Sequence, residues 1–269
     1  MSIVTIQRPN GLVYLVSDDF RAAGGVAHAF STRKGGVSRG IYASLNLGAN
    51  RGDAPAAVLE NYHIFCSDVG LSEKQLVFSR QVHQDNIRVV TGEDAGKGLF
   101  RPIDYEADGL ITNVPGLPLV IFTADCIPIL LYDPVQRAIG AVHAGWRGTA
   151  LGIVKKAVEK MGKVYGCQPG NILAAIGPGI CQDCFETDAD VPAALKAALG
   201  ETVTPYIQPR GPKFHVDLKG INALWLRQAG VLHISAAQDC THCQPALYWS
   251  HRRVQNNRGS QASCIQLLS

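Results

Sequence analysis

Two short polar motifs, separated by apolar residues, constrain the fold of this chain more than any other feature. The first, Thr123–Pro128, has the sequence Thr-Ala-Asp-Cys-Ile-Pro, and the second, Val142–Gly148, has the sequence Val-His-Ala-Gly-Trp-Arg-Gly. Residues 127–132 and 138–142 are rich in Ile, Leu and Val, and Asp-Pro-Val-Gln between them signals a turn. The pattern predicts two paired strands that bring both motifs to the same end of a sheet.

The pairing of these strands decides whether Cys126 and His143 meet. If the turn opposes residues 133 and 136, Cys126 lies directly opposite His143, with Cβ atoms roughly 5 Å apart. Such a pair could share a metal, act as nucleophile and base, or simply pack in the core. Pro134 suits a type I turn in a longer loop, and a slip of one residue would separate the side chains. The polar and aromatic neighbours favour an active site: Asp125, Trp146 and Arg147.

Composition narrows the class of protein. The chain has 269 residues, of which 46% are hydrophobic and 17% charged, and it shows no repeats or linkers, so we expect one domain over residues 1–269. A formal net charge of +3 gives little support to nucleic-acid binding, and Asp125 interrupts the longest apolar stretch, so no membrane span is expected. Without a signal peptide, the eight cysteines are expected to be reduced thiols in a cytoplasmic protein.

The rest of the chain alternates between strand and helix patterns. Asn-Gly between residues 3–7 and 12–16 indicates a hairpin, and residues 75–90 are expected to form two strands or one bent strand, with Gln81 and His83 on the same face. Amphipathic spacing predicts helices over 53–69, after an aspartate cap, and over 149–164. Further helices are expected over 192–199 and 218–229, and further strands over 107–112, 119–123, 172–176, 231–236 and 262–268.

Several basic segments could bind an anion. Arg33 and Lys34 precede a glycine pair in a loop that could approach an anion or be solvated. Arg147 lies where a loop leads into a predicted helix N-terminus, a position that favours phosphate. Residues 248–258 gather three arginines that are either solvated or line the pocket of an anionic substrate.

Two Cys-x-x-Cys pairs lie in the C-terminal half of the chain. Cys181 and Cys184 form the first pair, Cys240 and Cys243 the second, and together they could hold a zinc ion on four thiolates. The 55 residues between the pairs far exceed the spacing of a zinc ribbon, so the sequence argues against a shared metal.

Taken in order, these motifs resemble the YfiH-type family, also called the laccase-domain, multicopper polyphenol oxidase or peptidoglycan editing factor family. The resemblance covers nearly the whole chain and is most specific at Ala-Asp-Cys, ending at Cys126, and at His-Ala-Gly-Trp-Arg-Gly, beginning at His143. Gln84, Thr187-Asp188 and Asn256–Gly259 depart from the family pattern. The other matching segments are Ser31–Arg33, Gly35–Ser38, Ser44–Gly48, Gly52-Asp53, Gln81–His83, Ala107-Asp108, Ile176–Pro178, Phe185-Glu186 and Ser250–Arg253.

The resemblance implies an α+β fold of mixed β-sheets flanked by helices, in which Cys126 and His143 take positions like those of a Cys-His hydrolase. It also implies that His83, Cys126 and His143 bind one zinc ion. Two imidazoles and one thiolate leave a fourth tetrahedral position open, as in catalytic zinc sites. Copper also binds such ligands, but the only methionines are Met1 and Met161, and no His-x-His pair occurs, so copper polyphenol oxidase chemistry is disfavoured.

The resemblance further implies purine nucleoside phosphorolysis on adenosine, inosine and S-methyl-5'-thioadenosine, with adenosine deamination as a second activity. Phosphorolysis needs groups that hold phosphate beside the ribose, and Arg33 and Arg147 are the expected ligands for phosphate or ribose oxygens. Asn46 and Gln81 are expected hydrogen-bonding partners of the substrate. Asp125 is expected to orient Arg147 or a metal ligand.

Alternatives from other classes stay open. Because the zinc deaminase signature is absent, deamination would need another proton shuttle, for which Asp85, Asp108 and Asp125 are the choices. A metal-free cysteine hydrolase would use Cys126 as nucleophile and His143 as base. A non-enzymatic role in binding peptidoglycan precursors or a partner synthetase is the remaining alternative, and a homodimer is one option for the oligomeric state.

Overall fold

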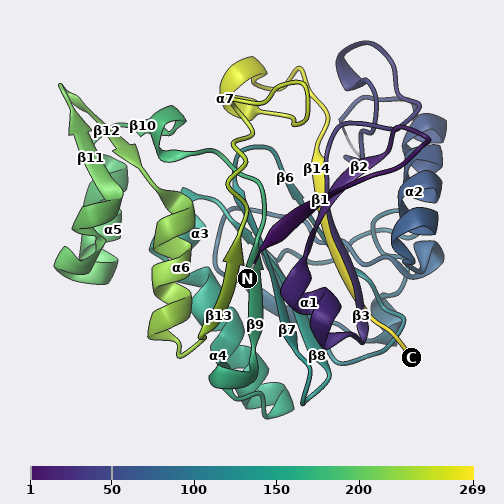
Figure 1. The fold of residues 1–269 in the computed structure, drawn as a ribbon, viewed down its shortest axis with the longest axis horizontal. Helices are drawn as coiled ribbons and strands as arrows, with labels where there is room; N and C mark the ends of the chain where they lie inside the picture. The colour runs from purple at the N-terminus through teal and green to yellow at the C-terminus, as the bar shows by residue number, and fades with distance from the viewer. Residues whose placement is uncertain (1, 50) are drawn as a thin grey trace.

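The computed structural model describes residues 2–49 and 51–269 and has the mixed α+β architecture expected from the sequence (Figure 1). A five-stranded sheet has the order β1-β2-β3-β14-β6, a six-stranded sheet has the order β13-β9-β7-β8-β5-β4, and a small sheet has the order β10-β12-β11. The strands are β1 (Ile3–Gln7), β2 (Val13–Ser17), β3 (Val26–Ser31), β4 (Ile87–Val89), β5 (Gly109–Thr112), β6 (Leu119–Thr123), β7 (Ile127–Asp133), β8 (Ala138–Ala144), β9 (Leu173–Ile176), β10 (Glu186–Thr187), β11 (Ile207–Arg210), β12 (Lys213–Val216), β13 (His233–Ala236) and β14 (Gln261–Leu267). The α-helices are α1 (Asp18–Ala23), α2 (Pro55–Val69), α3 (Trp146–Ala150), α4 (Ile153–Tyr165), α5 (Asp190–Leu199), α6 (Leu218–Gln228) and α7 (His251–Val254).

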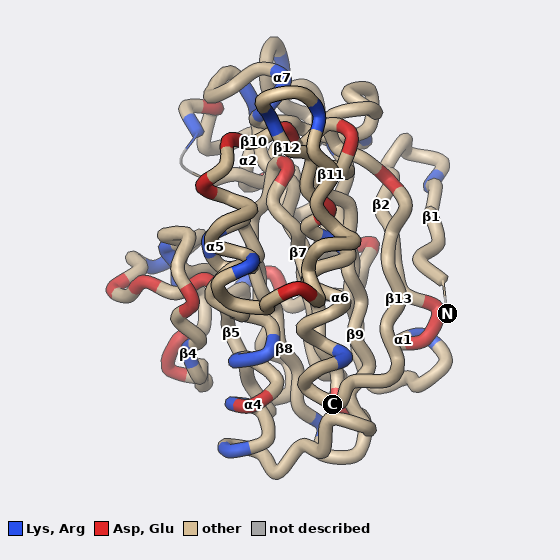
Figure 2. Tube along the Cα trace, turned by 90° about the vertical axis from the view of Figure 1, so that its left-hand side faces the viewer, with Lys and Arg blue, Asp and Glu red and all other residues tan. Residues whose placement is uncertain are grey.

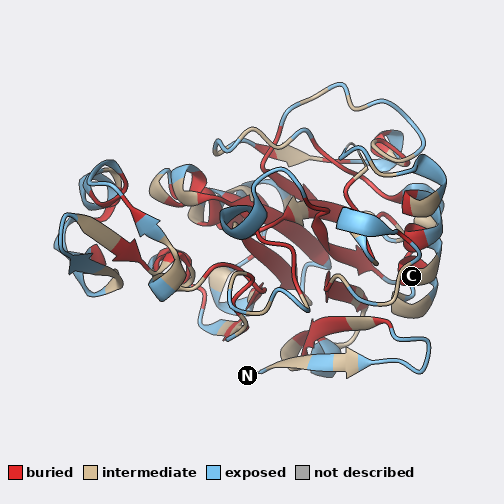
Figure 3. Cartoon of the chain, turned by 90° about the horizontal axis from the view of Figure 1, so that it is seen from above, coloured by how far each residue is buried: buried red, intermediate tan, exposed pale blue. Residues whose placement is uncertain are grey.

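The two larger sheets pack against each other, and helices cover their outer faces. Alternation along β7 shows how the layers form, because Leu130 and Tyr132 join the core between the sheets, whereas Ile129 and Leu131 join the core under α4 and α6. On the opposite side, α2 packs on the outer face of the five-stranded sheet. The buried strands therefore lie at the centre of four layers (Figure 3).

The first and last strands of the chain share one sheet. The predicted N-terminal hairpin is confirmed, with Gln7 opposite Val13. The C-terminal strand β14 lies between β3 and β6, so that Ser263 is opposite both Phe30 and Ile121. This placement carries the preceding segment, residues 248–260, over one end of the two packed sheets.

The β7–β8 hairpin forms, but the register expected from its turn is wrong. Asp133 pairs with Ala138, so His143 lies opposite Pro128 rather than Cys126. The loop is longer than expected because Asp133 Oδ1 accepts the N–H groups of Val135 and Gln136 at 2.9 and 3.0 Å and the chain closes through a left-handed Arg137 (φ 48°). A shift of two residues keeps every side chain on its expected face, so the two motifs still meet.

Two other expected elements differ from the structure. The helix over 149–164 is divided into α3 and α4, because Gly152 takes a left-handed conformation (φ 70°) against the ring of Trp225. Only β4 forms within residues 75–90, and the left-handed His83 (φ 60°) breaks the alternation that would have placed Gln81 and His83 on one face. Both differences come from tertiary contacts that local patterns do not report.

The remaining expected strands and helices form with ends within about two residues of their expected positions. Helix α2 starts at Pro55 after Ala54, and Asp53 is not its cap, because this carboxylate accepts hydrogen bonds from Ser38 Oγ and Asn46 Nδ2. Strand β3 and the small β10-β12-β11 sheet were not expected. Within residues 2–49 and 51–269, no helix combines the length and the apolar character needed to cross a bilayer.

Candidate active site

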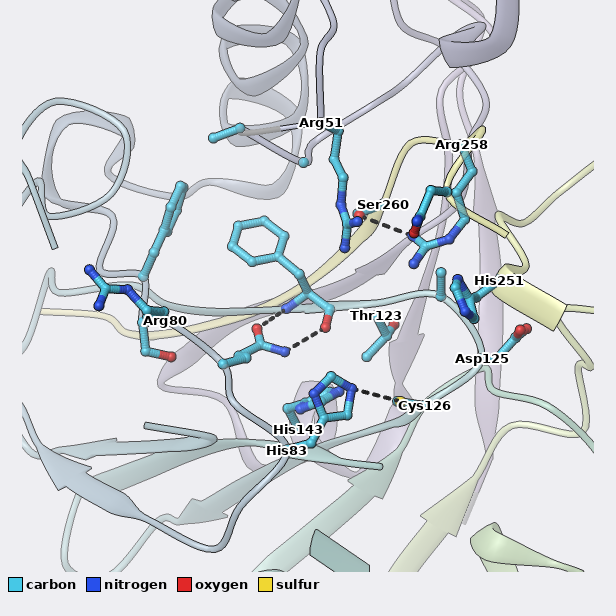
Figure 4. A pocket seen from close by; sticks show the side chains of 18 of the residues that line it. Arg51, Arg80, His83, Thr123, Asp125, Cys126, His143, His251, Arg258 and Ser260 are labelled. Carbon is cyan, nitrogen blue, oxygen red and sulfur yellow. Dashed lines mark hydrogen bonds between the residues drawn. The ribbon is translucent and has the colours of Figure 1, made fainter. Parts of the chain in front are cut away.

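Three side chains, His83, Cys126 and His143, converge at one end of the two packed sheets, and we call them the ligand triad. Their ligand atoms all lie within 4.8 Å of one another. Cys126 Sγ is 4.0 Å from His83 Nε2, and the two imidazole rings are nearly perpendicular, with centroids 4.8 Å apart (Figure 4). The structure therefore brings together the three residues that the family resemblance named.

A buried carboxylate, Asp108, positions both histidines. Its Oδ1 lies 2.8 Å from His143 Nδ1, and its two oxygens accept the backbone N–H groups of Val82, His83 and Gln84, each at 3.0 Å. These three donors stabilise the left-handed conformation of His83, which is costly for a residue other than glycine. Because Nδ1 of His143 faces Asp108, its Nε2 is the nitrogen available to a metal.

Asp125 forms the bend that presents Cys126. It has a left-handed backbone (φ 87°), and its carboxylate accepts hydrogen bonds from Thr241 Oγ1 (2.6 Å), Ser250 Oγ (3.1 Å) and the Arg252 N–H (2.6 Å). Such a backbone costs on the order of 1–3 kcal/mol, which hydrogen bonds to a carboxylate can offset. The C-terminal loop thus fixes the bend between β6 and β7.

The charges of the triad favour a thiolate in the metal-free protein. Burial alone would raise the pKa of the Cys126 thiol, but the charge of His143 and hydrogen bonds from His143 and His83 lower this pKa to about 6. Burial alone would lower the pKa of His143, but the Cys126 thiolate and the Asp108 carboxylate raise it to about 9. Between these values the pair is a thiolate beside an imidazolium.

The space between the triad residues suits one metal ion. A Cβ atom added at Gly145 would lie 3.0 Å from His83 Cδ2 and 3.3 Å from Cys126 Sγ. Gly145 has φ −71°, which any residue adopts, so its backbone conformation does not require glycine. What the absent side chain provides is room between His83 and Cys126. Two imidazoles and one thiolate are the ligand types that zinc prefers, and three of them leave one position for a substrate or water.

A pocket of about 900 Å³ lies in front of the triad (Figure 4). Asp125 is the one carboxylate among its described lining residues. Lysine and arginine gather at this end of the molecule, around α7 (Figure 2). The pocket also has four aromatic walls, from Phe78, Phe122, Trp146 and Phe185, and six arginines, namely Arg51, Arg80, Arg101, Arg147, Arg252 and Arg258. It therefore suits a ligand that combines negative charge with a flat ring.

Arg258, which was not among the expected site residues, has the strongest geometric case for anion binding. Its side chain is buried, Nη1 donates to the Gly259 carbonyl at 2.9 Å, and Nε has no partner among the described residues. Burial, together with the nearby charge of Arg51, lowers the pKa of Arg258 to about 10. Two neighbouring guanidinium groups in one pocket wall concentrate positive charge, which favours an anion (Figure 4). In the sequence, Arg258 could be found only as one of the three arginines gathered in residues 248–258.

Two residues expected to bind substrate do not line the pocket. Arg33 donates to the carbonyls of Ala43 and Pro245 and lies 3.7 Å from the centre of the Trp249 ring. Asn46 is fully buried, and its amide bonds to Asp53 and to the backbone N–H groups of Gly48 and Ser260. The polar groups of both side chains are already bonded to neighbouring segments of the protein. Both residues therefore stabilise loops and have no free group for a substrate.

The other expected site residues do line the pocket. The amide of Gln81 exchanges two hydrogen bonds with the backbone of Phe122, at 2.7 and 2.8 Å, so it ties a loop to β6. Arg147 is exposed and stacks on Trp146, with its guanidinium 4.4 Å from the ring centre. Asp125 contacts the C-terminal loop instead of Arg147.

The fold and the site define a class of proteins: an antiparallel sheet packed on a mixed sheet, with a Cys/His ligand set at the mouth of an arginine-lined pocket. The chain belongs to the family described as multi-copper polyphenol oxidoreductase laccase, whose family model matches residues 27–268. The family predicted from the motifs is thereby confirmed.

Similar proteins carry the names of enzymes. The purine nucleoside phosphorylase of Deinococcus radiodurans is 40% identical over 243 residues, which cover 90% of this chain and 89% of that protein. Adenosine deaminase RL5, from an unknown prokaryotic organism, is 34% identical over 262 residues, covering 92% of this chain and 97% of that protein. The crystal structure of the hypothetical protein YfiH from Bacillus licheniformis matches with a TM-score of 0.91 at 31% identity and covers 98% of each chain. Together the names of the relatives support an enzyme.

Proposed function

We propose that this protein is a zinc-dependent purine nucleoside phosphorylase acting on adenosine, inosine and S-methyl-5'-thioadenosine, with adenosine deamination as a second activity. The observation that carries the proposal is the arginine-lined pocket that opens directly onto the ligand triad. Phosphorolysis of a nucleoside brings a phosphate dianion to the anomeric carbon, and a pocket with six arginines can hold that charge. The names of the relative from Deinococcus radiodurans and of RL5 support purine nucleosides, adenosine among them, as the substrate class.

The arginines are assigned to phosphate. Arg258 and Arg51 lie side by side in the pocket wall, and their guanidinium groups can together hold a phosphate group (Figure 4). Arg147 can add a further donor because it is exposed and its stacking on Trp146 leaves its N–H edge free. Holding phosphate and ribose side by side converts a reaction of two molecules into one within a complex, which is a large part of the rate enhancement.

The purine is assigned to the aromatic walls. Trp146 and Phe185 are partly exposed in the pocket and offer faces on which a purine can stack. The departing purine gains negative charge and needs a proton, and His251 is a pocket imidazole outside the ligand triad (Figure 4). We assign His251 as the proton donor to the purine.

The triad is assigned to zinc. When bound, zinc supplies positive charge that stabilises a developing oxyanion and lowers the pKa of a water molecule. The part of the protein is to hold the ligands ready: Asp108 fixes His143 and the His83 backbone, and Asp125 fixes the bend at Cys126. Met161 is on the buried face of α4, and Met1 lies outside the described residues, so the described chain offers no axial methionine for a copper site.

The three aspartates considered as proton shuttles for deamination are all engaged. Asp85 forms an ion pair with Lys156, Asp108 binds His143 and three N–H groups, and Asp125 holds the C-terminal loop. Deamination is therefore assigned to the same zinc site with His251 as the proton-transfer group, and we expect it to be slower than phosphorolysis.

The test is to incubate the purified protein with adenosine, with and without phosphate, and to measure adenine, ribose 1-phosphate and inosine. Phosphorolysis predicts adenine and ribose 1-phosphate in equal amounts, and only with phosphate present. Inosine formed without phosphate would report the second activity. An absence of all three products, with zinc bound, would overturn the proposal.

One observation favours a second candidate function. Asp108, His143 and Cys126 form the chain of contacts that a metal-free cysteine hydrolase uses, and the pKa of Cys126 is already lowered to about 6. Metal analysis separates the two, because zinc bound to the sulfur would occupy the nucleophile.

A non-enzymatic role in binding peptidoglycan precursors predicts instead that Cys126→Ala keeps its biological effect.

A further inference from the structure

Four cysteines outside the pocket, which we call the cysteine cluster, meet in space. The sulfur atoms of Cys181, Cys184, Cys240 and Cys243 all lie within 4.8 Å of one another, and those of Cys184 and Cys243 are 3.3 Å apart. All four are free thiols. The spacing along the sequence argued against a shared metal, yet the structure brings the two pairs together.

The topology of the six-stranded sheet explains why the two pairs meet. Strands β9 and β13 are parallel neighbours, with Ile176 opposite Ala236. Parallel strands end at the same edge of a sheet, and the segments that follow them run on together, since Gly179 bridges to Cys240 and accepts the N–H of Thr241 at 3.3 Å. The 55 residues between the pairs contain the crossover through β10, α5, β11, β12 and α6 and then strand β13, which returns the chain beside β9. Their number therefore does not separate the pairs in space.

We propose that the cysteine cluster binds a second zinc ion through four thiolates, at a structural site separate from the ligand triad. Tetrahedral zinc with Zn–S bonds of about 2.3 Å needs four sulfurs that are mutually about 3.8 Å apart. The approach of all four sulfurs to one another fits this need, whereas disulfides would join them only two by two. The Cys-x-x-Cys spacing of each pair is also common in structural zinc sites.

The backbone around the sulfurs fits the same site. The N–H of Cys184 donates to the Cys181 carbonyl at 3.1 Å, and that of Gln244 donates to the Cys240 carbonyl at 3.1 Å, so each pair lies on a tight turn. The N–H of Cys181 also points at Cys240 Sγ at 3.3 Å, which stabilises negative charge on that sulfur.

A cation lies beside the cysteine cluster. Lys219 Nζ donates to the carbonyls of Ala237 and Asp239, at 2.9 and 2.6 Å, just before Cys240. Four thiolates and one zinc ion carry two net negative charges, which this ammonium group partly neutralises.

The position of the cluster gives it a role in the shape of the pocket. The first cysteine pair lies between Ile180 and Phe185, and Arg252, which follows the second pair, donates to the Glu186 carbonyl at 2.9 Å. Thr241, between the cysteines of the second pair, bonds the Asp125 carboxylate. A zinc ion at the cluster would therefore fix the pocket wall that carries Phe185 and Arg252 and the bend before Cys126.

The test is the zinc content per chain after dialysis against a chelator, a readout that does not depend on the proposed phosphorylase reaction. We expect two zinc ions in the wild-type protein, one in Cys126→Ala and one in the double variant Cys184→Ser/Cys243→Ser. X-ray absorption on Cys126→Ala should show a zinc ion with four sulfur neighbours and no nitrogen. Cys167→Ala, which removes a buried thiol outside both sites, is the matched control and should keep two zinc ions.

Two results would overturn the proposal. One is Cys126→Ala protein without zinc, in which the cluster thiols either react freely or are oxidised to disulfides. The other is a double variant that still holds two zinc ions. If the double variant does not fold, the metal content of Cys126→Ala decides the question by itself. If the double variant folds, the pocket wall that carries Phe185 and Arg252 should become less fixed. The KM for phosphate should then rise while the ligand triad keeps its zinc.

Discussion

The His143 ring nitrogen Nδ1 lies 2.8 Å from the Asp108 carboxylate, and the same carboxylate holds the backbone of His83. One buried aspartate thus sets the orientation of two of the three proposed metal ligands, which come from a loop and from a strand far apart in the sequence.

Asp108→Asn should weaken metal binding about 10- to 100-fold, the range seen when a group behind a metal ligand is lost. The amide nitrogen of Asn would face N–H donors that now meet a carboxylate oxygen, so the His83 turn and the His143 orientation would both relax. Zinc affinity measured by chelator competition checks this. Asp188→Asn, at an exposed position, is the control, and an unchanged affinity in Asp108→Asn would refute the positioning role.

Gly145→Ala should reduce zinc affinity and activity, because the added methyl group would lie 3.0 Å from a His83 ring carbon and 3.3 Å from Cys126 Sγ. The backbone at this position accepts alanine, so overall stability should change little. Zinc titration and thermal unfolding together separate the two effects. Gly170→Ala, where a Cβ would meet no atom within 4 Å, serves as control; equal zinc affinity in both variants would contradict the account.

Arg258→Met and Arg147→Ala should each raise the KM for phosphate about 10- to 100-fold, corresponding to loss of one hydrogen bond between charged groups. The zinc content should stay that of the wild type, because neither side chain belongs to the ligand triad. Steady-state rates at varied phosphate concentration measure the effect. Arg227→Ala, on the exposed side of α6, is the control. An unchanged phosphate dependence would remove the substituted arginine from the phosphate site.

Alkylation of Cys126 in the metal-free protein should follow an apparent pKa of about 6 rather than the ordinary thiol value of 9. The thiolate is the reactive form, so the rate should fall about tenfold per pH unit below pH 6 and level off above it. His143→Ala removes the cation that lowers this pKa and should move the inflection to higher pH. Iodoacetamide rates corrected with Cys126→Ala protein give the measurement, and an inflection near 9 in the wild type would contradict the thiolate–imidazolium pair.

Local patterns in the sequence predicted most of the fold. Apolar runs rich in Ile, Leu and Val predicted β6, β7 and β8, a final strand was expected at β14, and Asn-Gly predicted the first hairpin. The ligand triad was named only through the family resemblance. Cys126 and His143 still meet despite the wrong register, because the error was an even number of residues. That residues 1–269 form a single domain stays a prediction, as does the homodimer.

The arrangement of distant loops could not be predicted in this way. Arg51 and Arg258 lie more than 200 positions apart in the sequence and become neighbours only when β14 inserts between β3 and β6. The cysteine cluster forms because β9 and β13 are parallel neighbours. The spacing of the cysteines along the sequence does not contain that information. Arg33 looked free to bind an anion, yet the carbonyls of Ala43 and Pro245 occupy its guanidinium.

The central claim is that the ligand triad and the arginine-lined pocket form one phosphorolytic site. The measurement that tests it most directly is the rate of ribose 1-phosphate formation from adenosine and phosphate by the wild type and by His83→Ala, Cys126→Ala and His143→Ala, each with its zinc content. We predict that the wild type forms ribose 1-phosphate and that each substitution abolishes both that product and the zinc ion of the triad. Full activity in any one of the three variants would contradict the account.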